Sequence, residues 1–468
     1  MRRKTVYLVV LLFIISNIFT FLASENFYRQ LQEELPPPPE PNQELQPLIE
    51  VLDILSERYL EDVSRQELID AAISGMVDSL GDPQTHYMSA SDWENIMIKI
   101  DGSFSGVGVE ITSIDGYITV VVPIKDTPGE RAGLLPGDRI IAVDGQDLIG
   151  ASTLEAATLM RGKEGTKVTL TVERDGLAEP FELEIIRSNI VVPSVFPEML
   201  EERIGFIQIT NFDEHTGKDF QEALLELETK GMRGLILDFR GNPGGLLSEA
   251  IKICQEILPE GLITQMVDAD GNVIEAYHSY GTKKDYPIVA LINGTSASAA
   301  EIVCGALQDT GTGILVGTKT YGKATVQHLE SISNGYGLRY TIAKYQTPKG
   351  RDIHGQGLEP DLVVELPEDF YTLQFSLIRD LKPGDKSVEV LILQKMLNAL
   401  SFTVAETGEF DQATEKAVRT FQQEQGLELT GFVDQASRTR LRAEIDLVLE
   451  QMDTQKQKAL EVMQEKLN

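Results

Sequence analysis

The stretch IVALINGTSASAAEIVCGAL, residues 288–307, decides the fold of the middle of the chain. Its first five residues are apolar and predict a buried strand. The small residues of 293–298 predict a tight turn, and the apolar spacing that follows predicts a helix. Residues 234–239 and 246–257 repeat the strand and the helix. This alternation predicts an α/β or α+β layer over residues 188–381, with its strand ends aligned for chemistry.

Ser298 stands where this turn meets the helix, which makes it the first candidate nucleophile. A helix start offers free N–H groups and the positive end of the helix dipole, and both stabilise an oxyanion. The N–H of Ala299 is the natural donor. The Gly-x-Ser-x-Gly elbow of α/β-hydrolases is absent, because the residue two places after Ser298 is Ala300.

The predicted helix and strand after Ser298 bring the chain back so that Lys323 is expected to lie near Ser298. A helix of about twelve residues descends ~18 Å, and a strand over 314–318 climbs back ~17 Å. Gln327 shares a strand face with Lys323, so it is expected to orient the amine. A lysine pKa near ~10.4 must fall before the amine can accept a proton at neutral pH, and we expect burial and the helix N-terminus to lower it.

A second oxyanion donor is expected in LILDFRGNPGG, residues 235–245, where a buried strand ends in a glycine turn. Gly244 and Gly245 are the candidates. Two alternatives stay open: Ser298 merely caps a helix while Lys323 is a solvated loop lysine, or a histidine is the base. The histidines are scattered and show no metal-ligand spacing or acid partner, which argues against the second alternative: His86, His215, His278, His328 and His354.

Residues 103–187 predict a small β-rich module with strands at 107–111, 117–122, 139–143 and 167–173 and one helix at 153–160. Gly106-Val107-Gly108-Val109 leads into an edge strand that could capture an extended peptide, its amides holding a terminal carboxylate. The run AGLLPGD, residues 132–138, and then IIAVDG, residues 140–145, resemble PDZ domains. A β-sandwich without a ligand is the alternative.

The N-terminus predicts export. Arg2, Arg3 and Lys4 precede an apolar run over residues 6–22, and residues 1–24 are therefore a signal anchor or a signal peptide. Seventeen residues reach ~26 Å, close to the ~30 Å of a bilayer core, and no small-residue cleavage pair is evident, so the anchor is favoured. Residues 25–44 form a proline-rich spacer.

Helical spacing recurs outside these regions. Residues 45–102 contain two amphipathic helices that either pack on the protein or pair two subunits. Residues 383–445 predict three short helices, at 388–400, 411–423 and 434–441, with glycines at the turns. The tail over 446–468 has weak helical spacing, and without a partner it is expected to be a marginal helix.

Composition limits the partners. The 468 residues imply two to four domains, and an apolar share of 42% implies folded cores. A formal net charge of −32 argues against nucleic acid. Cys254 and Cys304 each lie in an apolar helical pattern, so neither a disulfide nor a metal site is expected.

The order of these motifs resembles the carboxy-terminal processing (tail-specific) peptidases. A PDZ-like segment is followed by DFRGNPGG, residues 238–245, then SASAAEI, residues 296–302, then VGTKTYGKATVQ, residues 316–327. The resemblance implies that Ser298, Lys323 and Gln327 are the catalytic set. It also implies a ClpP/crotonase-like core, a PDZ module that receives substrate C-termini and gates access, and a dimer formed partly by the N-terminal helices. Glu301 and Asp309 match supporting positions, whereas Ala300 and Ala324 replace a frequent Ser and Gly.

The terminal module resembles peptidoglycan-binding domains through QKML, GEFD, FQ and TG motifs in residues 394–431. Leu400-Ser401-Phe402 departs from the usual Gly-aromatic turn. A helical bundle that only contacts protein is the alternative.

The sequence thus predicts an α+β multidomain serine endopeptidase at the cell envelope, tethered to the membrane, with no cofactor and no metal. It would take a substrate C-terminus in the PDZ module and cleave through an acyl-enzyme. The alternative is a non-catalytic scaffold that joins peptide binding to peptidoglycan binding.

Overall fold

The computed structural model describes residues 43–468 in two compact units that divide after Tyr87. The expected anchor and nearly all of the expected spacer lie outside the described residues. None of the helices described in residues 43–468 has the length and apolar character needed to cross a bilayer.

The first unit contains the two expected amphipathic helices, α2 (Gln46–Arg58) and α3 (Arg65–Asp78). Ser64 begins α3 with a capping box, because its hydroxyl accepts from the Glu67 N–H while the Glu67 carboxylate accepts from the Ser64 N–H. No residue of α2 is buried. The helix leaves a set of large apolar side chains exposed: Leu48, Ile49, Val51, Ile54 and Leu55.

The second unit begins earlier than the sequence predicted. Residues 45–102 were expected to form one helical region, but α4 (Ala90–Asp101) belongs to the second unit. Its C-terminal end is bonded there, because the Ile100 carbonyl accepts from the Glu214 N–H and the Gly102 carbonyl accepts from the Val192 N–H. The sequence analysis expected two helices in residues 45–102 and did not predict α4.

The PDZ-like module is an antiparallel sheet in the order β3-β4-β5-β7-β8, with α6 (Thr153–Met160) packed against β3. Its strands are β3 (Val109–Ile114), β4 (Tyr117–Pro123), β5 (Arg139–Val143), β7 (Lys167–Glu173) and β8 (Phe181–Ile186). The first strand was predicted to begin at Val107. It begins at Val109 because Gly108 has φ +78° and lies against Thr127, which turns the chain away from extended geometry.

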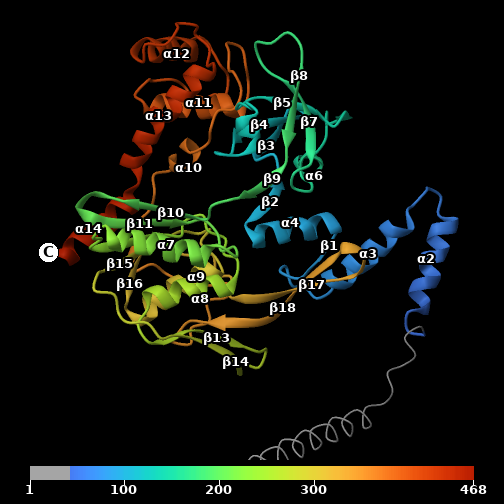
Figure 1. Ribbon diagram of the computed structural model, residues 1–468, viewed down its shortest axis with the longest axis vertical. Helices are drawn as coiled ribbons and strands as arrows, with labels where there is room; N and C mark the ends of the chain where they lie inside the picture. The colour runs from blue at the N-terminus through green and yellow to red at the C-terminus, as the bar shows by residue number, and fades with distance from the viewer. Residues whose placement is uncertain (1–42) are drawn as a thin grey trace, which may run out of the picture. The chain divides into compact units, whose positions relative to one another are not determined.

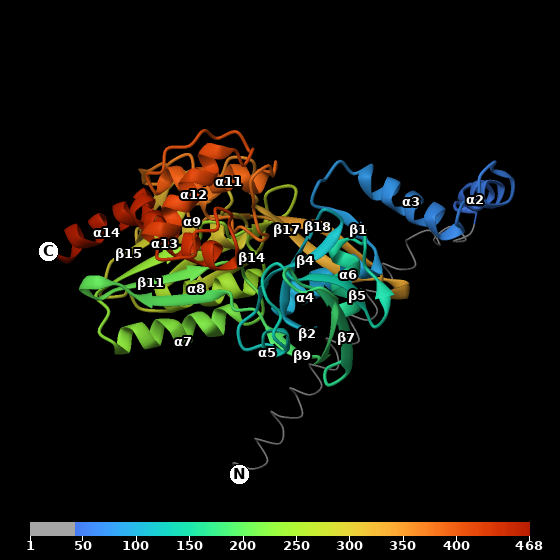
Figure 2. The same ribbon diagram turned by 90° about the horizontal axis from the view of Figure 1, so that it is seen from above.

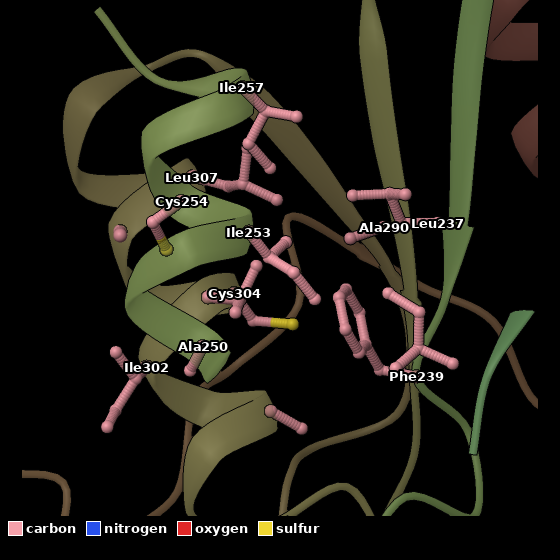
Figure 3. Close-up of a cluster of buried hydrophobic side chains, with 14 of the residues drawn as sticks. Leu237, Phe239, Ala250, Ile253, Cys254, Ile257, Ala290, Ile302, Cys304 and Leu307 are labelled. Atoms are coloured by element: carbon pink, nitrogen blue, oxygen red, sulfur yellow. The ribbon is translucent and has the colours of Figure 1, made fainter. Parts of the chain in front are cut away.

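The core is a six-stranded sheet, parallel except at one edge, in the order β10-β11-β12-β15-β16-β19. The strands are β10 (Val195–Met199), β11 (Ile204–Ile209), β12 (Gly234–Asp238), β15 (Ile288–Ile292), β16 (Gly313–Gly317) and β19 (Leu362–Val363). One face packs against α7 (Thr216–Thr229), α8 (Leu247–Ile257) and α9 (Ala299–Thr310). Figure 3 shows apolar side chains of α8 and α9 pointing at Leu237, Phe239 and Ala290.

A smaller antiparallel sheet adjoins the core. It contains β13 (Gly261–Val267), β14 (Val273–Ser279), β17 (Thr325–Ser331) and β18 (Gly337–Gln346). β17 and β18 form a hairpin that continues the chain from Lys323.

The C-terminal module has its own apolar core between α11 (Val388–Ala399), α12 (Gln412–Glu424) and the start of α13 (Gln435–Met452) (Figure 1). The third helix was predicted to end at Leu441. It continues to Met452 because Ile445 and Leu449 extend its apolar face along the module.

The tail was expected to be a marginal helix if it had no partner, and the structure gives it one. The tail forms α14 (Thr454–Leu467), whose Ala459, Val462 and Met463 are buried against Ile236, Val289 and other residues on the second face of the core sheet. Figure 2 shows α7 and α14 on opposite sides of this sheet. The C-terminal module is therefore an insertion in the core, between β19 and α14.

Candidate functional site

Ser298 lies between β15 and α9, as the sequence predicted, in a backbone conformation that side chains rarely adopt. Its φ is 55° and its ψ is −117°. A non-glycine residue in such a region stores about 1–3 kcal/mol of strain, which the surrounding contacts must offset. The elbow motif of α/β-hydrolases is absent, yet Ser298 is presented on a strained turn between a strand and a helix.

Gly244 brings the 239–245 loop into direct contact with this turn. A Cβ added to Gly244 would lie 2.7 Å from the Ser298 Cβ and 2.8 Å from the Ala297 carbonyl oxygen. Its φ of +100° also favours glycine. Only a residue without a side chain allows this approach.

The two glycines of this loop differ as N–H donors. The Gly244 N–H donates to Asn242 Oδ1 at 2.8 Å, so it is already engaged. No hydrogen bond within residues 43–468 uses the Gly245 N–H. Ala299, in the first turn of α9, has no intrahelical acceptor for its N–H. Of the two predicted glycines, Gly245 is the better candidate to face an oxyanion together with Ala299.

Glu301 joins the Ser298 and Lys323 backbones. Its Oε2 accepts from the Ser298 N–H at 2.9 Å and from the Lys323 N–H at 2.8 Å. Its Oε1 accepts from the Gly322 N–H and the Thr320 hydroxyl. This carboxylate is fully buried, and all four of its partners are donors. The two segments, far apart in the sequence, are thus adjacent in space, as the lengths of α9 and β16 predicted.

Tyr345, on β18, holds the same two residues from their carbonyl side. Its hydroxyl lies 2.7 Å from the Lys323 carbonyl oxygen and 3.0 Å from the Ser298 carbonyl oxygen. Burial, with the nearby Glu301, raises the pKa of Tyr345 well above its ordinary value, so the hydroxyl stays protonated as a donor. The sequence analysis missed Tyr345, because nothing near it in the sequence refers to Ser298.

Gln327 lies beside Thr325 on β17. Its side-chain amide donates to Thr325 Oγ1 at 2.8 Å, and the β17–β18 register shifts between Val326 and Gln327. The extra residue at this shift is Ile342 of β18, so alternation along β17 is kept, and the bond between Thr325 and Gln327 agrees with the expected shared face.

Asp309 lies at the other end of α9 from Ser298. It pairs with Arg351 at 2.6 Å and accepts from the Lys349 N–H. Both partners of Asp309 belong to the 347–358 loop. This loop also makes hydrogen bonds to Thr320 and Gly322, the residues just before Lys323. Ala300 and Ala324, the two departures from the family pattern, are buried in the apolar core.

His354 is the histidine that the hydrogen bonds bring nearest to Lys323. It is exposed, and its Nδ1 lies 3.4 Å from the Ala324 N–H. Within the described part of the chain, no group of three or more His, Cys, Asp or Glu side chains is arranged to hold a metal ion.

The predicted peptide-binding segment of the PDZ-like module directs two carbonyls inward. The Val107 carbonyl accepts from the Gly129 N–H, and the Gly108 carbonyl accepts from the Ile124 N–H and the Thr127 hydroxyl. In the described residues, the N–H groups of Val107 and Gly108 make no hydrogen bond. These two amides precede the edge strand β3, although Val107 and Gly108 are themselves buried, and a carboxylate is held by amides so placed.

Four family models match the chain. Residues 203–364 match peptidase family S41, and residues 119–174 match the PDZ domain. Residues 386–441 match a peptidoglycan binding domain, and residues 17–92 match the N-terminal domain of the activating protease CtpB.

Similar proteins cover nearly the same span. The carboxy-terminal processing protease CtpA of Bacillus subtilis (strain 168) is 37% identical over 410 residues, 87% of this chain and 88% of that protein. CtpB of the same strain is 34% identical over 399 residues, 84% and 83% of the two chains. The solved structure of a photosystem II D1 C-terminal processing protease is 28% identical with a TM-score of 0.42, covering 69% of this chain and 89% of that one.

Proposed function

The chain belongs to the carboxy-terminal processing proteases, with an S41 peptidase core and a PDZ domain, and from that premise we propose that Ser298 and Lys323 form its catalytic dyad. The prediction of a serine-type carboxy-terminal processing peptidase is confirmed by these relatives. The observation that carries the dyad is the Glu301 carboxylate, which accepts hydrogen bonds from the N–H groups of both residues.

In the proposed reaction, Ser298 Oγ attacks the scissile carbonyl carbon while its proton passes to the neutral Lys323 amine. The N–H groups of Ala299 and Gly245 stabilise the oxyanion. When the C–N bond breaks, Lys323 gives the proton to the leaving amine, and an ester remains on Ser298. Lys323 then takes a proton from a water molecule as that water attacks the ester carbon, and it returns the proton to Ser298 Oγ when the C–O bond breaks and the acid product leaves. Gln327 orients the amine.

We propose that the PDZ domain captures an unstructured substrate C-terminus. The Val107 and Gly108 amides hold its carboxylate, and β3 pairs with the peptide as an added strand. The segment Gly106-Val107-Gly108-Val109 is thus the substrate-binding loop. The match to the PDZ model and the free amides of this loop support the assignment.

The remaining assignments concern location and assembly. We propose that residues 383–445 bind peptidoglycan, that residues 1–24 anchor the enzyme, and that residues 103–468 work outside the cytoplasm. The exposed apolar face of α2 supports pairing of two subunits through the N-terminal helices. The parallel core sheet, flanked by α7–α9 and α14, supports the ClpP/crotonase-like assignment.

The test of the dyad uses the chain without residues 1–42 and fluorescein-labelled β-casein as an unfolded substrate. Ser298→Ala and Lys323→Ala should each lower kcat by at least about 10³-fold, because each removes a group that takes part in every turnover. The matched control is Lys319→Ala, which removes an exposed lysine of the same loop whose ion pair in residues 43–468 is with Glu359.

His354→Ala tests the rival base. It should retain activity within about twofold, since its imidazole meets the Lys323 segment only at the Ala324 N–H. Cleavage by Ser298→Ala or Lys323→Ala at the wild-type rate would remove the dyad and leave the scaffold alternative standing. Loss of activity in His354→Ala with retention in Lys323→Ala would make the histidine the base.

A further inference from the structure

The inserted C-terminal module connects to the core through two chain crossings. The chain leaves the core after β19 and passes through α10 (Phe370–Leu373) into the module. It returns along α13 and enters α14 at Asp453, which caps that helix by accepting from the Lys456 N–H at 2.9 Å. Each crossing makes a direct bond to one of the two loops that surround Ser298.

The segment that returns from the module to the core, between α13 and α14, is bonded to the 239–245 loop through Asp453. Arg240 donates to both oxygens of Asp453, at 2.8 and 2.9 Å, and also to both oxygens of Asp238. The three side chains are only 13%, 9% and 3% exposed, so the ion triad is largely shielded from water. Burial alone would lower the pKa of Arg240, but Asp238 and Asp453 outweigh it and raise that pKa. A charged arginine bonded at both edges of its plane has little freedom to turn.

The segment that leaves the core for the module, which contains α10, is bonded to the 293–298 loop through Tyr371. The Asn293 side-chain amide donates to the Tyr371 hydroxyl of α10 at 2.9 Å. The carbonyl oxygen of the same side chain accepts from the Thr295 N–H and from the Gly241 N–H of the neighbouring loop. Tyr371, which is 48% exposed, thus bonds directly to the side chain that organises the turn before Ser298.

The two loops are bonded to one another and so respond together. The Ser296 hydroxyl donates to the Phe239 carbonyl at 2.8 Å, and the Ala297 N–H donates to the Asn242 carbonyl at 2.9 Å. A cavity of about 770 Å³ otherwise lies between the crossings and the loops. Among the described residues that line it, Asp453 and Tyr371 bond to the loops, and Gln455 of α14 adds a longer contact of 3.3 Å to Arg240.

We propose that Asp453 and Tyr371 are positioning residues of the peptidase. Asp453 acts through Arg240 on the loop that carries Gly245, and Tyr371 acts through Asn293 on the turn that carries Ser298. The two segments that connect the inserted module to the core thereby supply part of the rigidity of the oxyanion site. The inference rests on the proposed role of Ser298.

The test measures β-casein cleavage and the rate at which a fluorophosphonate probe labels Ser298. Asp453→Asn keeps the helix cap but weakens the pair with Arg240, and Tyr371→Phe removes one hydroxyl. Each should lower kcat and the labelling rate about tenfold to hundredfold with KM changed less than threefold, because small misplacements of reacting groups have effects of this size. Asp453→Glu, which restores the charge, should recover part of the loss.

The matched control is Asp411→Asn, the same change at the cap of α12, where Asp411 accepts from Thr414 and lies away from both loops. It should match wild type in kcat and labelling. Wild-type kcat and labelling in Asp453→Asn and Tyr371→Phe would overturn the inference, and so would losses that only follow the fraction of unfolded protein. If Ser298→Ala also cleaved, the proposed dyad would fail first, so the two failures are distinguishable.

Discussion

At the scale of single residues, two side chains hold four backbone groups of the proposed dyad. Glu301 accepts from the N–H groups of Ser298 and Lys323, and the Tyr345 hydroxyl lies against the carbonyls of the same two residues. A hydroxyl has one proton, so only one carbonyl receives a full hydrogen bond at a time. This clamp fixes how the nucleophile and base segments lie relative to each other.

Tyr345→Phe should lower kcat about tenfold and the free energy of unfolding by about 0.5–1.5 kcal/mol, since it removes the hydrogen bond of one part-buried hydroxyl, while the Ser298 carbonyl keeps the Ile302 N–H as a donor. Tyr321→Phe, which alters an exposed ring two residues before Lys323, should change neither. Cleavage kinetics and urea unfolding would measure both effects. Equal behaviour of the two variants would contradict the clamp.

The raised pKa of Tyr345 also predicts a pH dependence. The unfolded tyrosine loses its proton above pH ~10, whereas the folded one keeps it, so the unfolded state is favoured as pH rises past that value. The stability difference between wild type and Tyr345→Phe should be constant below pH ~9.5 and shrink above it. Urea unfolding at pH 8, 9.5 and 10.5 checks the sign. A difference that grows at high pH would refute it.

Gly244→Ala should reduce kcat at least about hundredfold, because the new Cβ would overlap Ser298 Cβ and push the nucleophile from its place. Gly241→Ala is a close control, since Gly241 also has a positive φ of +75°, but a Cβ added there would meet no atom within 4 Å. Both variants place an alanine at a positive φ, but only the alanine at position 244 overlaps Ser298. Similar activity in both would show that strain, and not contact with Ser298, limits the reaction.

At the scale of elements, α14 covers a sheet face that would otherwise be apolar and open. Gly234 on β12 has no side chain, and a Cβ there would lie 2.9 Å from the Met463 sulfur. The helix therefore packs directly on the strand backbone. The sequence of the tail has weak apolar spacing because only one narrow side of α14 enters this contact.

Met463→Ala should lower the free energy of unfolding by about 2–5 kcal/mol, as expected for a fully buried methionine. Leu447→Ala, at a position of α13 that is 56% exposed, should change it by less than about 0.5 kcal/mol. Urea unfolding followed by far-ultraviolet circular dichroism would separate the two. A small effect at Met463 would mean that the tail does not belong to the core in solution.

At the scale of the whole molecule, charge and modular order set the conditions for wall binding. The net charge of −32 repels anionic polymers, so any retention by the envelope must come from specific contacts. We expect the chain without residues 1–42 to sediment with purified peptidoglycan, and retention to hold or rise between 50 and 300 mM NaCl, because salt screens the repulsion. Retention that falls steeply with salt would indicate charge attraction and contradict the assignment of residues 383–445.

Much of the fold could be predicted because it depends on neighbours in the sequence. The strand, turn and helix around Ser298 follow from apolar periodicity and small residues, and the lengths of α9 and β16 bring Lys323 back beside Ser298. The order of PDZ-like module, core and helical module follows from turn signals in the same way. The boundary at Tyr87 and the length of α13 could not be predicted in this way, because both depend on which unit or core a helix packs against.

The sequence by itself determined which residues can do chemistry and in which order the chain presents them, since residue type and spacing act locally. Only the tertiary structure decided that the tail packs on the core, that the N–H of Gly244 is engaged while that of Gly245 is not, that Tyr345 bonds to the Ser298 and Lys323 carbonyls, and that Asp453 bonds to Arg240. Each of these depends on surfaces that lie far apart along the chain and meet only when the sheets and helices pack.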